Sequence, residues 1–398
     1  MTKLSSIADY VTDKISSNDI SLYEYVTTDC MLQNKKGREV ATNLPPQPCC
    51  LTHYQRGDVL IANIRPYLKK VWFADIDGGA SSDVLVFRAK KGHSPSFLYA
   101  VLLQDSFFDY VMQGAKGSKM PRGDKEQILR YEMPILSCSE ESIGTFFLNL
   151  DYKIRLNEQI NQNLEAMAKQ LYDYWFVQFD FPNEEGKPYK SSGGEMLWND
   201  KLKRNIPVGW HCGNLFEIAV FTNGLACQKF RPKDDEVPLP VIKIREMHDG
   251  ISVDTEEVTS NIPESVKVYN GDVLFSWSAS LEVMLWAYGL GGLNQHIFKV
   301  TSANDFPKSF YYFQLLDYVD VFKKMAEARK TTMGHITQDH LQQSTIAIPD
   351  NKDVADKFEK LISPIFKQIV KLQEEISNLI KQRDELLPLL MNGQITIE

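Results

Sequence analysis

Two long segments of the chain carry apolar residues at alternating spacings of three and four, which predicts amphipathic helices. In the C-terminal segment the stripe is broken only by an arginine and comprises Ile362, Ile365, Ile369, Leu372, Ile376, Leu379, Arg383, Leu386 and Leu390. The central segment has a similar stripe of Leu156, Ile160, Leu164, Met167, Leu171 and Tyr174, with Asn157, Asn161 and Asn163 close beside it. We expect the two helices to pair with each other. Packing of each helix on its own domain is the alternative interpretation.

Shorter apolar segments repeat along the chain in a fixed order. The sequence "GDVLIANIRPYLKKVWFAD" at 57–75 is echoed by "GDVLFSWSASLEVMLWAYG" at 271–289. Apolar helical runs follow at 94–111 and 307–325, and short strands follow at 131–136 and 344–349. Alternation and β-branched residues also predict strands at 82–89 and 295–300. Matched segments are displaced by about 214 residues throughout, so the chain contains a duplicated unit.

The predicted fold class is therefore α+β. Two mixed α/β domains in tandem duplication are separated by two long antiparallel, coiled-coil-like helices, with pseudo-twofold symmetry. The expected boundaries are a first domain at 1–138, a central helix at 139–178, a linker at 179–205, a second domain at 206–350, a C-terminal helix at 351–392 and a tail at 393–398. The linker is rich in Pro, Gly, Ser and charge, a composition that does not predict a core.

Length and composition agree with this organisation. The 398 residues exceed one typical domain and allow two cores, and 43% of them are hydrophobic. The chain has no apolar run of eighteen residues and no signal peptide, so we expect a cytoplasmic protein without membrane contact. Its six cysteines form no C-x-x-C pair, and we expect no metal site.

Charge is distributed unevenly. A net charge of −8 argues against bulk attraction to nucleic acid. However, residues 116–130 carry five basic and two acidic side chains, and residues 321–335 carry four basic and one acidic. Either stretch alone would be an ordinary solvated surface. Their matched positions in the repeat favour a shared binding role.

Motifs for catalysis are missing. The sequence has no G-x-x-x-x-G-K-[ST], G-x-S-x-G or H-E-x-x-H motif, and "TNLPPQP" at 42–48 fails as an amino-methyltransferase motif. His335 and His340 are five residues apart, which places them on different faces of a helix. We expect a non-catalytic chain without a cofactor of its own.

The same segments resemble the specificity subunit of Type I restriction-modification systems. The resemblance covers nearly the whole chain and depends on "GASSDVLVF", "AKQLYDYWFVQFDFP", "GKPYKSSGGEM", "LNQHIFKV", "TTMGHITQDHL" and "RDELLPLLMNGQI" in this order, together with the GDVL segments. It implies two target recognition domains that each read half of a split double-stranded DNA site. It also implies that the helix pair sets the spacer and carries two modification subunits. Those partners would use S-adenosylmethionine, and restriction subunits would use ATP and Mg.

Candidate site residues follow from the repeat and the resemblance. Contacts to the DNA backbone are expected from Lys116, Lys119 and Arg122 in the first unit, and from Arg329, Lys330, Thr331 and Thr332 in the second. Contacts to base edges or grooves are expected from Arg65, Lys69 and Lys70, and from Ser276, Trp277 and Ser278, although Trp277 is also a candidate for the core. Modification subunits are expected at Trp175, Phe176, Leu386 and Leu390, for which packing within the helix pair is an equal alternative.

Other functions compete with this interpretation. A coiled-coil scaffold without a DNA role would leave the repeated basic stretches unexplained. A catalytic restriction-modification polypeptide would require the missing methyltransferase motifs, and the specificity part of a related fused restriction-modification enzyme is a further alternative.

Overall fold

The computed structural model describes residues 2–133, 139–278, 280–328, 336 and 338–396. The chain divides into two compact units. Unit 1 comprises Met1–Arg155 and Leu379–Glu398, and unit 2 comprises Leu156–Asn378. Two long helices, α5 (Glu140–Tyr172) and α10 (Asp353–Met391), contribute residues to both units.

A four-stranded antiparallel sheet forms the centre of unit 1, with strand order β2-β9-β6-β7. The strands are β2 (Ala8–Tyr10), β6 (Val59–Ala62), β7 (Val71–Phe73) and β9 (Val84–Ala89). In the register, Leu60 lies opposite both Trp72 and Val86. The predicted helical run at 94–111 is two helices, α2 (Pro95–Leu103) and α3 (Asp105–Gln113), because Gln104 between them has an extended backbone. Both helices bury apolar residues in the core of this unit.

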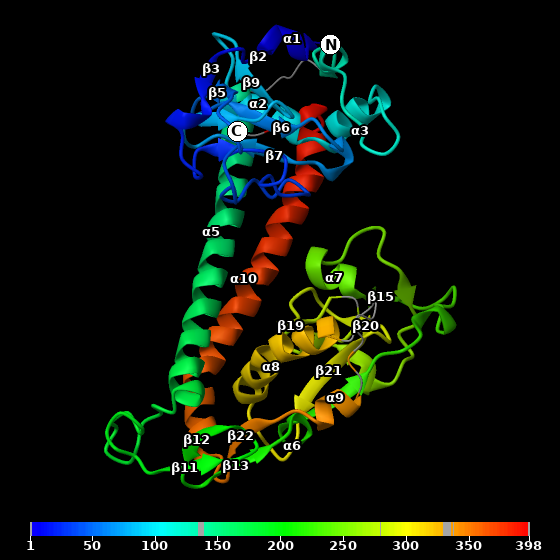
Figure 1. The fold of residues 1–398 in the computed structure, drawn as a ribbon. Helices are drawn as coiled ribbons and strands as arrows, with labels where there is room; N and C mark the ends of the chain where they lie inside the picture. The colour runs from blue at the N-terminus through cyan, green and yellow to red at the C-terminus, as the bar shows by residue number, and fades with distance from the viewer. Residues whose placement is uncertain (1, 134–138, 279, 329–335, 337, 397–398) are drawn as a thin grey trace. The chain divides into compact units, whose positions relative to one another are not determined.

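Unit 2 repeats this central sheet with strand order β14-β21-β18-β19. The strands are β14 (Ala219–Asn223), β18 (Val273–Ser276), β19 (Glu282–Leu285) and β21 (Ile297–Ser302). One helix, α8 (Lys308–Ala328), takes the place of α2 and α3 in the order of elements (Figure 1). The duplicated sequence segments therefore fold alike, and the predicted mixed α/β repeat is confirmed.

A second sheet in each unit departs from the repeat at one edge. In unit 1 its order is β3-β5-β8-β4, and in unit 2 it is β16-β15-β20-β17. Both sheets contain a short glycine-rich strand, β8 (Gly78–Ala80) or β20 (Gly291–Leu293), with one parallel and one antiparallel neighbour. The edge strand differs between the units. In unit 1, β3 pairs with β5, the antiparallel neighbour of β8; in unit 2, β16 pairs with β15, the parallel neighbour of β20. The remaining strands are β3 (Lys14–Ser16), β4 (Tyr25–Val26), β5 (Cys50–Tyr54), β15 (Leu239–Ile242), β16 (Glu257–Val258) and β17 (Lys267–Val268).

Each unit also contains a matched pair of short strands. In unit 1, β1 (Thr2–Lys3) pairs with β10 (Glu132–Met133), and in unit 2, β13 (Trp210–Gly213) pairs with β22 (Ile346–Pro349). The short helices are α1 (Leu4–Ile7), α4 (Lys125–Ile128), α6 (Leu215–Ile218), α7 (Ile244–Asp249) and α9 (Gln338–Gln342).

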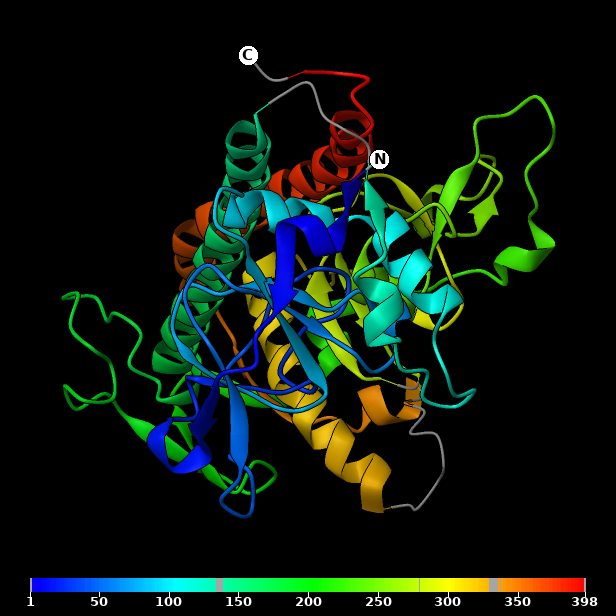
Figure 2. The same ribbon diagram turned by 90° about the horizontal axis from the view of Figure 1, so that it is seen from above.

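The two long helices contact each other in opposite directions. In unit 1, Arg383 of α10 reaches Asp151 of α5. In unit 2, the Phe358 ring lies 6.2 Å from that of Tyr172 and 5.5 Å from that of Trp175, which belongs to a π-helical turn (Asp173–Val177) after α5. Residue numbers therefore rise along one helix as they fall along the other, which confirms the antiparallel pair; Figure 2 gives a second view of these helices.

The structure corrects the predicted packing face of the central helix. In the predicted stripe, Leu156, Ile160, Met167 and Tyr174 are 41%, 37%, 44% and 38% exposed, whereas Leu164 and Leu171 are partly buried and pack against the core of unit 2. The buried positions are instead Ile143, Phe147, Asp151, Ile154, Asn157, Asn161, Ala168, Tyr172 and Trp175. These positions are separated by three, four or seven residues and so also lie on one helix face, but three of them are polar. Hydrophobic periodicity thus identified the helix but not the face that tertiary contacts cover.

The structure also corrects the expectation for residues 179–205. Phe179 and Phe181 are buried in the core of unit 2, and the Phe181 ring stacks 5.6 Å from Trp210. The segment continues into a hairpin of β11 (Met196–Asn199) and β12 (Arg204–Pro207). Two phenylalanines are enough to anchor a segment whose average composition predicts no core.

Candidate nucleic-acid interface

In unit 1 the structure brings two predicted basic segments together. Beyond β6, the chain turns through a short 3-10 helix, η2 (Pro66–Leu68), before it enters β7. The Arg65 backbone N–H donates to the Pro121 carbonyl at 2.8 Å, and Ile64 and Arg122 form an isolated β-bridge. A second bridge joins Lys116 to Arg122. Arg65 therefore lies on a loop bonded to the basic loop at 116–122.

The cations of this loop cluster are accessible. Arg65 and Lys119 are exposed. Lys116 is 3.0 Å from Asp124, and Arg122 is 3.1 Å from Asp83, with 83% and 58% of the two basic side chains exposed. Exposed ion pairs contribute little to stability. Lys116 and Arg122 can therefore exchange these carboxylates for phosphate oxygens at small cost.

Asp124 has a second role that ties it to the fold. Its carboxylate accepts hydrogen bonds from the backbone N–H groups of Glu126 and Gln127 and so caps α4. The hydrogen bond from Lys116, followed by these backbone bonds, lowers the pKa of the Asp124 carboxyl. The carboxylate is thus held ionised by the helix start even when Lys116 moves away.

Lys69 and Lys70 are placed differently from the prediction. The Lys69 ammonium is 2.9 Å from Asp105, and the Lys70 ammonium donates to the Thr28 carbonyl at 2.6 Å. Both side chains are only partly exposed. They stabilise the turn between β6 and β7, because Lys69 is paired with Asp105 of α3 and Lys70 is bonded to Thr28.

In unit 2 the residues after β18 include two buried serines. Ser276 is fully buried, and its hydroxyl donates to the Ser280 carbonyl and accepts from the Glu282 N–H at 3.1 Å. Ser278 is 8% exposed. Both serines are therefore within the fold and not on a reading surface.

Trp277 between these serines is partly exposed. Its indole N–H donates to Asn223 at 3.2 Å, and its ring centroid is 5.5 Å from that of His296. Its carbonyl accepts from the Ile336 N–H at 3.0 Å. In unit 2 the loop after the central strand is thus bonded to the segment after the basic stretch, whereas in unit 1 it is bonded to the basic loop itself. Arg329, Lys330, Thr331 and Thr332 lie outside the described residues.

The residues expected to bind modification subunits are mostly internal. Trp175 and Phe176 are 6% and 4% exposed and contact the Phe358 ring within unit 2. Leu390 is 2% exposed in the core of unit 1, and Leu386 packs against that core. Four exposed apolar residues of α5 and of the π-helical turn after it, defined here as the α5 stripe (Leu156, Ile160, Met167 and Tyr174), lie instead on the surface of unit 2.

Sequence reasoning missed two exposed apolar side chains in the loop cluster of unit 1. Tyr67 on η2 and Met120 on the basic loop are each 50% exposed. The sequence signal for their exposure is weak. Each residue is adjacent to a proline, Pro66 or Pro121, which predicts a turn but does not indicate which side chain faces solvent. Surface tyrosine beside arginine and lysine is nevertheless a combination that suits contact with nucleobases.

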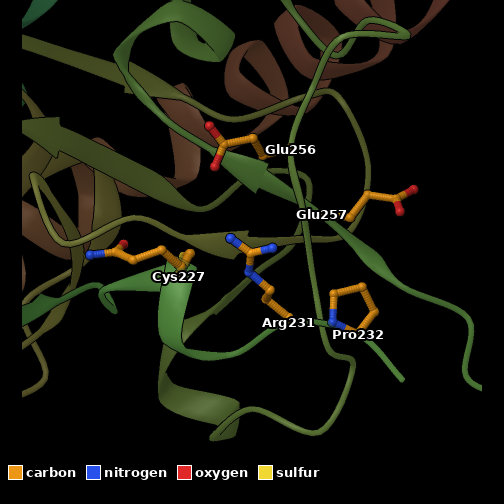
Figure 3. A pocket seen from close by; sticks show the side chains of 6 residues that line it. Cys227, Arg231, Pro232, Glu256 and Glu257 are labelled. Carbon is orange, nitrogen blue, oxygen red and sulfur yellow. The ribbon is translucent and has the colours of Figure 1, made fainter. Parts of the chain in front are cut away.

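A pocket of unit 2 has a different chemistry. It measures about 300 Å³ and is lined by Cys227, Gln228, Arg231, Pro232, Glu256 and Glu257 (Figure 3). Glu256 also forms an ion pair with Lys243, whose hydrogen bond lowers the pKa of the Glu256 carboxyl. Two glutamates against one arginine do not form a phosphate cradle. In the part of the chain that the structure describes, no cluster of three His, Cys, Asp or Glu residues could hold a metal.

The five described cysteines, Cys30, Cys49, Cys50, Cys212 and Cys227, are free thiols. Among the described residues, none of the helices is both long enough and apolar enough to cross a bilayer.

Comparisons with known proteins extend this description of a duplicated α+β chain with paired long helices and exposed basic loops. Residues 207–383 match the family model of the Type I restriction modification DNA specificity domain. The Type I restriction enzyme MjaIX specificity subunit of Methanocaldococcus jannaschii is 23% identical over 96% of this chain and 87% of its own length. The HindI specificity subunit of Haemophilus influenzae is 22% identical over 98% of each chain.

A solved structure agrees in fold. The S subunit of the Type I restriction-modification system from M. genitalium superposes with a TM-score of 0.57 at 12% identity, covering 98% of this chain and 95% of that one. Together these comparisons confirm the sequence-based resemblance: residues 207–383 match the DNA specificity domain, and nearly the whole chain is similar to specificity subunits of Type I restriction enzymes.

Proposed function

We propose that this subunit reads a bipartite site on double-stranded DNA, with one half read by each unit. The observation that carries the proposal is the duplicated architecture, in which a loop after the central strand is bonded to the basic loop or to the segment that follows it. The target recognition domains would span 1–138 and 206–350, with the segment at 179–205 and the two helices between and after them. The helix pair would set the length of the unread spacer.

Three exposed cations of unit 1, Lys116, Lys119 and Arg122, are proposed to contact backbone phosphates, and Arg65 to reach the groove. Arg329, Lys330, Thr331 and Thr332 would have the phosphate role in unit 2, and Trp277 would lie beside the DNA. Local basic loops can do this despite a net charge of −8, because the affinity depends on the phosphates that are actually neutralised. Lys69 and Lys70 would support the reading turn.

Two modification subunits are proposed to dock on the long helices, with the α5 stripe as one contact surface. An exposed apolar helix face is the kind of surface that an apolar helix of a partner covers. Those subunits would bind S-adenosylmethionine and methylate adenine, and restriction subunits would use ATP and Mg. The complex would act on DNA in the cytoplasm.

Discrimination would come from both halves together. Each mismatched base pair costs roughly 1–3 kcal/mol in specific protein–DNA complexes. A rigid connection between two readers adds a gain in effective concentration. Because the helix pair would set the spacer, inserting one heptad into both helices should lengthen the spacer and leave the half-sites unchanged.

The proposal is tested by mapping N6-methyladenine across a genome in cells that express intact modification subunits with or without this chain. Loss of one split motif on deletion supports the proposal and reveals both half-sites and the spacer. If the chain were a scaffold without a DNA role, the methylated motif would be unchanged although the partners are active. Expression of the Lys116→Ala, Lys119→Ala, Arg122→Ala variant should weaken methylation of the same motif.

A further inference from the structure

The turn between β6 and β7 in unit 1 has an unusual backbone. Arg65 and Lys69, which flank η2, have φ angles of +52° and +50°. Two residues bonded to this turn, Asn34 and Lys35, have φ angles of +56° and +63°. Their backbone N–H groups donate to the Leu68 and Lys69 carbonyls at 3.0 and 2.9 Å. Four residues with a Cβ therefore adopt left-handed conformations in one small region, a kind of strain that is concentrated at functional sites.

Buried charge holds the same turn in place. The Lys35 side chain is 5% exposed, and its ammonium is 2.9 Å from Asp105 and 3.1 Å from Asp384. Lys69 is 2.9 Å from the same oxygen of Asp105. Asp105 lies in the first turn of α3, where the helix dipole also favours a carboxylate. Lys35, Lys69 and Asp105 thus form a clamp across the turn, and Asp384 ties the clamp to α10.

The Asp105 carboxylate of the clamp favours its charged form. Partial burial of the Asp105 carboxyl, which is 52% exposed, opposes ionisation, but hydrogen bonds from Lys35 and Lys69 outweigh it and lower the pKa of Asp105. A buried ammonium is costly unless it is well paired. Lys35 therefore has a defined position, and so does the turn at η2, to which the Lys35 backbone N–H is bonded.

The clamped turn presents one aromatic side chain to solvent. Tyr67 is the middle residue of η2, is 50% exposed and forms no side-chain hydrogen bond within the described part of the chain. Arg65 precedes it on the turn, and Met120 lies on the basic loop whose Pro121 carbonyl accepts from the Arg65 N–H. The fold thus fixes the backbone under a side chain that the protein leaves half exposed.

On the basis of the proposed function, we propose that Tyr67 is a base-contacting residue for one half-site and that Lys35 and Asp105 are its positioning residues. The ring offers an apolar face and edge to base edges in a groove, where thymine methyl groups are read by apolar contact, and its hydroxyl adds a donor and an acceptor. The clamp fixes the backbone that carries the ring, so less backbone entropy is lost on binding.

The experiment uses the chain assembled with its modification subunits and the split motif obtained by methylation mapping. Competition binding compares the intact site with sites in which either half is scrambled. Tyr67→Ala should reduce discrimination at one half-site about tenfold, which corresponds to one contact of the usual strength, and leave the other half-site unaffected. Tyr23→Ala, which removes a 54% exposed tyrosine from the same unit, is the matched control and should preserve both discriminations.

The outcomes separate the two proposals. A wild-type complex that discriminates neither half-site contradicts the proposed function itself. A wild-type complex that discriminates both, with Tyr67→Ala discriminating equally well, overturns the role of Tyr67 alone. Equal losses in Tyr67→Ala and Tyr23→Ala also overturn it, since the effect would then belong to any exposed tyrosine.

The positioning role has its own measurement. Asp105→Asn removes the charge shared by Lys35 and Lys69, so the backbone amides of Lys35 and Lys69 should exchange with deuterium at least severalfold faster. Discrimination should fall at the half-site that depends on Tyr67, and Asp105→Glu should restore part of it. Unchanged exchange and unchanged discrimination in a variant that melts like the wild type would exclude the clamp.

Discussion

Arg383 of α10 and Asp151 of α5 form a buried ion pair in unit 1, with 3.3 Å between Nη1 and Oδ1 and with side chains that are 4% and 8% exposed. The other Asp151 oxygen accepts from the Tyr99 hydroxyl at 2.7 Å, and Arg383 Nε donates to Asp384 at 3.0 Å. Burial and then the Asp151 charge raise the pKa of Tyr99 well above its usual value. The arginine that interrupts the apolar stripe therefore does not break the helix contact, because two carboxylates compensate its charge.

Breaking this pair should destabilise unit 1. Arg383→Met leaves the Asp151 carboxylate buried without its counter-charge, and we expect a loss of about 3–5 kcal/mol in the free energy of unfolding. Urea unfolding followed by hydrogen exchange in unit 1 measures it. Asp151→Asn combined with Arg383→Met should recover much of the loss, since no charge is then stranded. A single-variant loss below about 1 kcal/mol would contradict the buried pair.

The basic loop of unit 1 should control the salt dependence of DNA binding. Replacing Lys116, Lys119 and Arg122 by Ala should reduce the steepness of log affinity against log salt by up to about 0.9 for each phosphate that the variant no longer neutralises. Titration of nonspecific duplex DNA at several salt concentrations measures this slope. The charge-matched control replaces the exposed Lys187, Lys190 and Lys201 of unit 2 by Ala. An equal change in both variants would mean that net charge, and not this loop, is responsible.

The α5 stripe should be required for partner binding but not for folding. Ile160→Glu with Met167→Glu adds charge to a face that is about two-fifths exposed, so the melting temperature of the chain should change little. Co-purification with the modification subunit should be lost, because a charge would be buried without a partner. Gln162→Glu, an exposed position on the same helix, is the control and should keep the partner. Retention of the modification subunit by the double variant would rule out the stripe.

Trp175 should behave in the opposite manner. Its side chain is 6% exposed and contacts Phe358, so Trp175→Ala should lower the free energy of unfolding by about 3–5 kcal/mol. Thermal and urea unfolding of the isolated chain measure this loss. Normal stability together with failure to bind a modification subunit would instead favour the sequence-based expectation that Trp175 is a partner contact.

His211 should give unit 2 a weak dependence on pH. Burial opposes its charged form, but hydrogen bonds with Asp350 and Glu217 outweigh burial and raise the pKa of the imidazole. The resulting stabilisation is fully present below the ordinary His pKa of about 6.5 and is lost as pH rises through the raised value. Because the ring is 46% exposed, the contribution should stay below about 1 kcal/mol.

The measurement compares unfolding of the wild type and His211→Gln between pH 5.5 and 8. The difference in stability between them should shrink as pH rises. A difference that is constant across this range would show that the ion pairs of His211 do not form in solution.

Local patterns in the sequence were sufficient for the elements and for their repetition. The matched GDVL segments became β6 and β18 in sheets of the same order, and the periodic segments became α5 and α10. Such patterns depend on residues a few positions apart. The basic loop could also be predicted, because cations on a loop are seldom buried. Which of the cations pair with carboxylates of the protein could not be predicted, as the ion pair of Lys69 with Asp105 shows.

By itself, therefore, the sequence determined the duplication, the two long helices, the family resemblance and the lack of catalytic motifs. Only the tertiary structure decided that Leu156, Ile160 and Met167 of α5 are exposed while Asp151 and Asn157 are buried. It also decided that Lys35 clamps a turn about 30 residues further along the chain through Asp105 and Asp384. Burial and ion pairing depend on contacts between residues far apart in the chain, and no local spacing encodes which of those contacts will form.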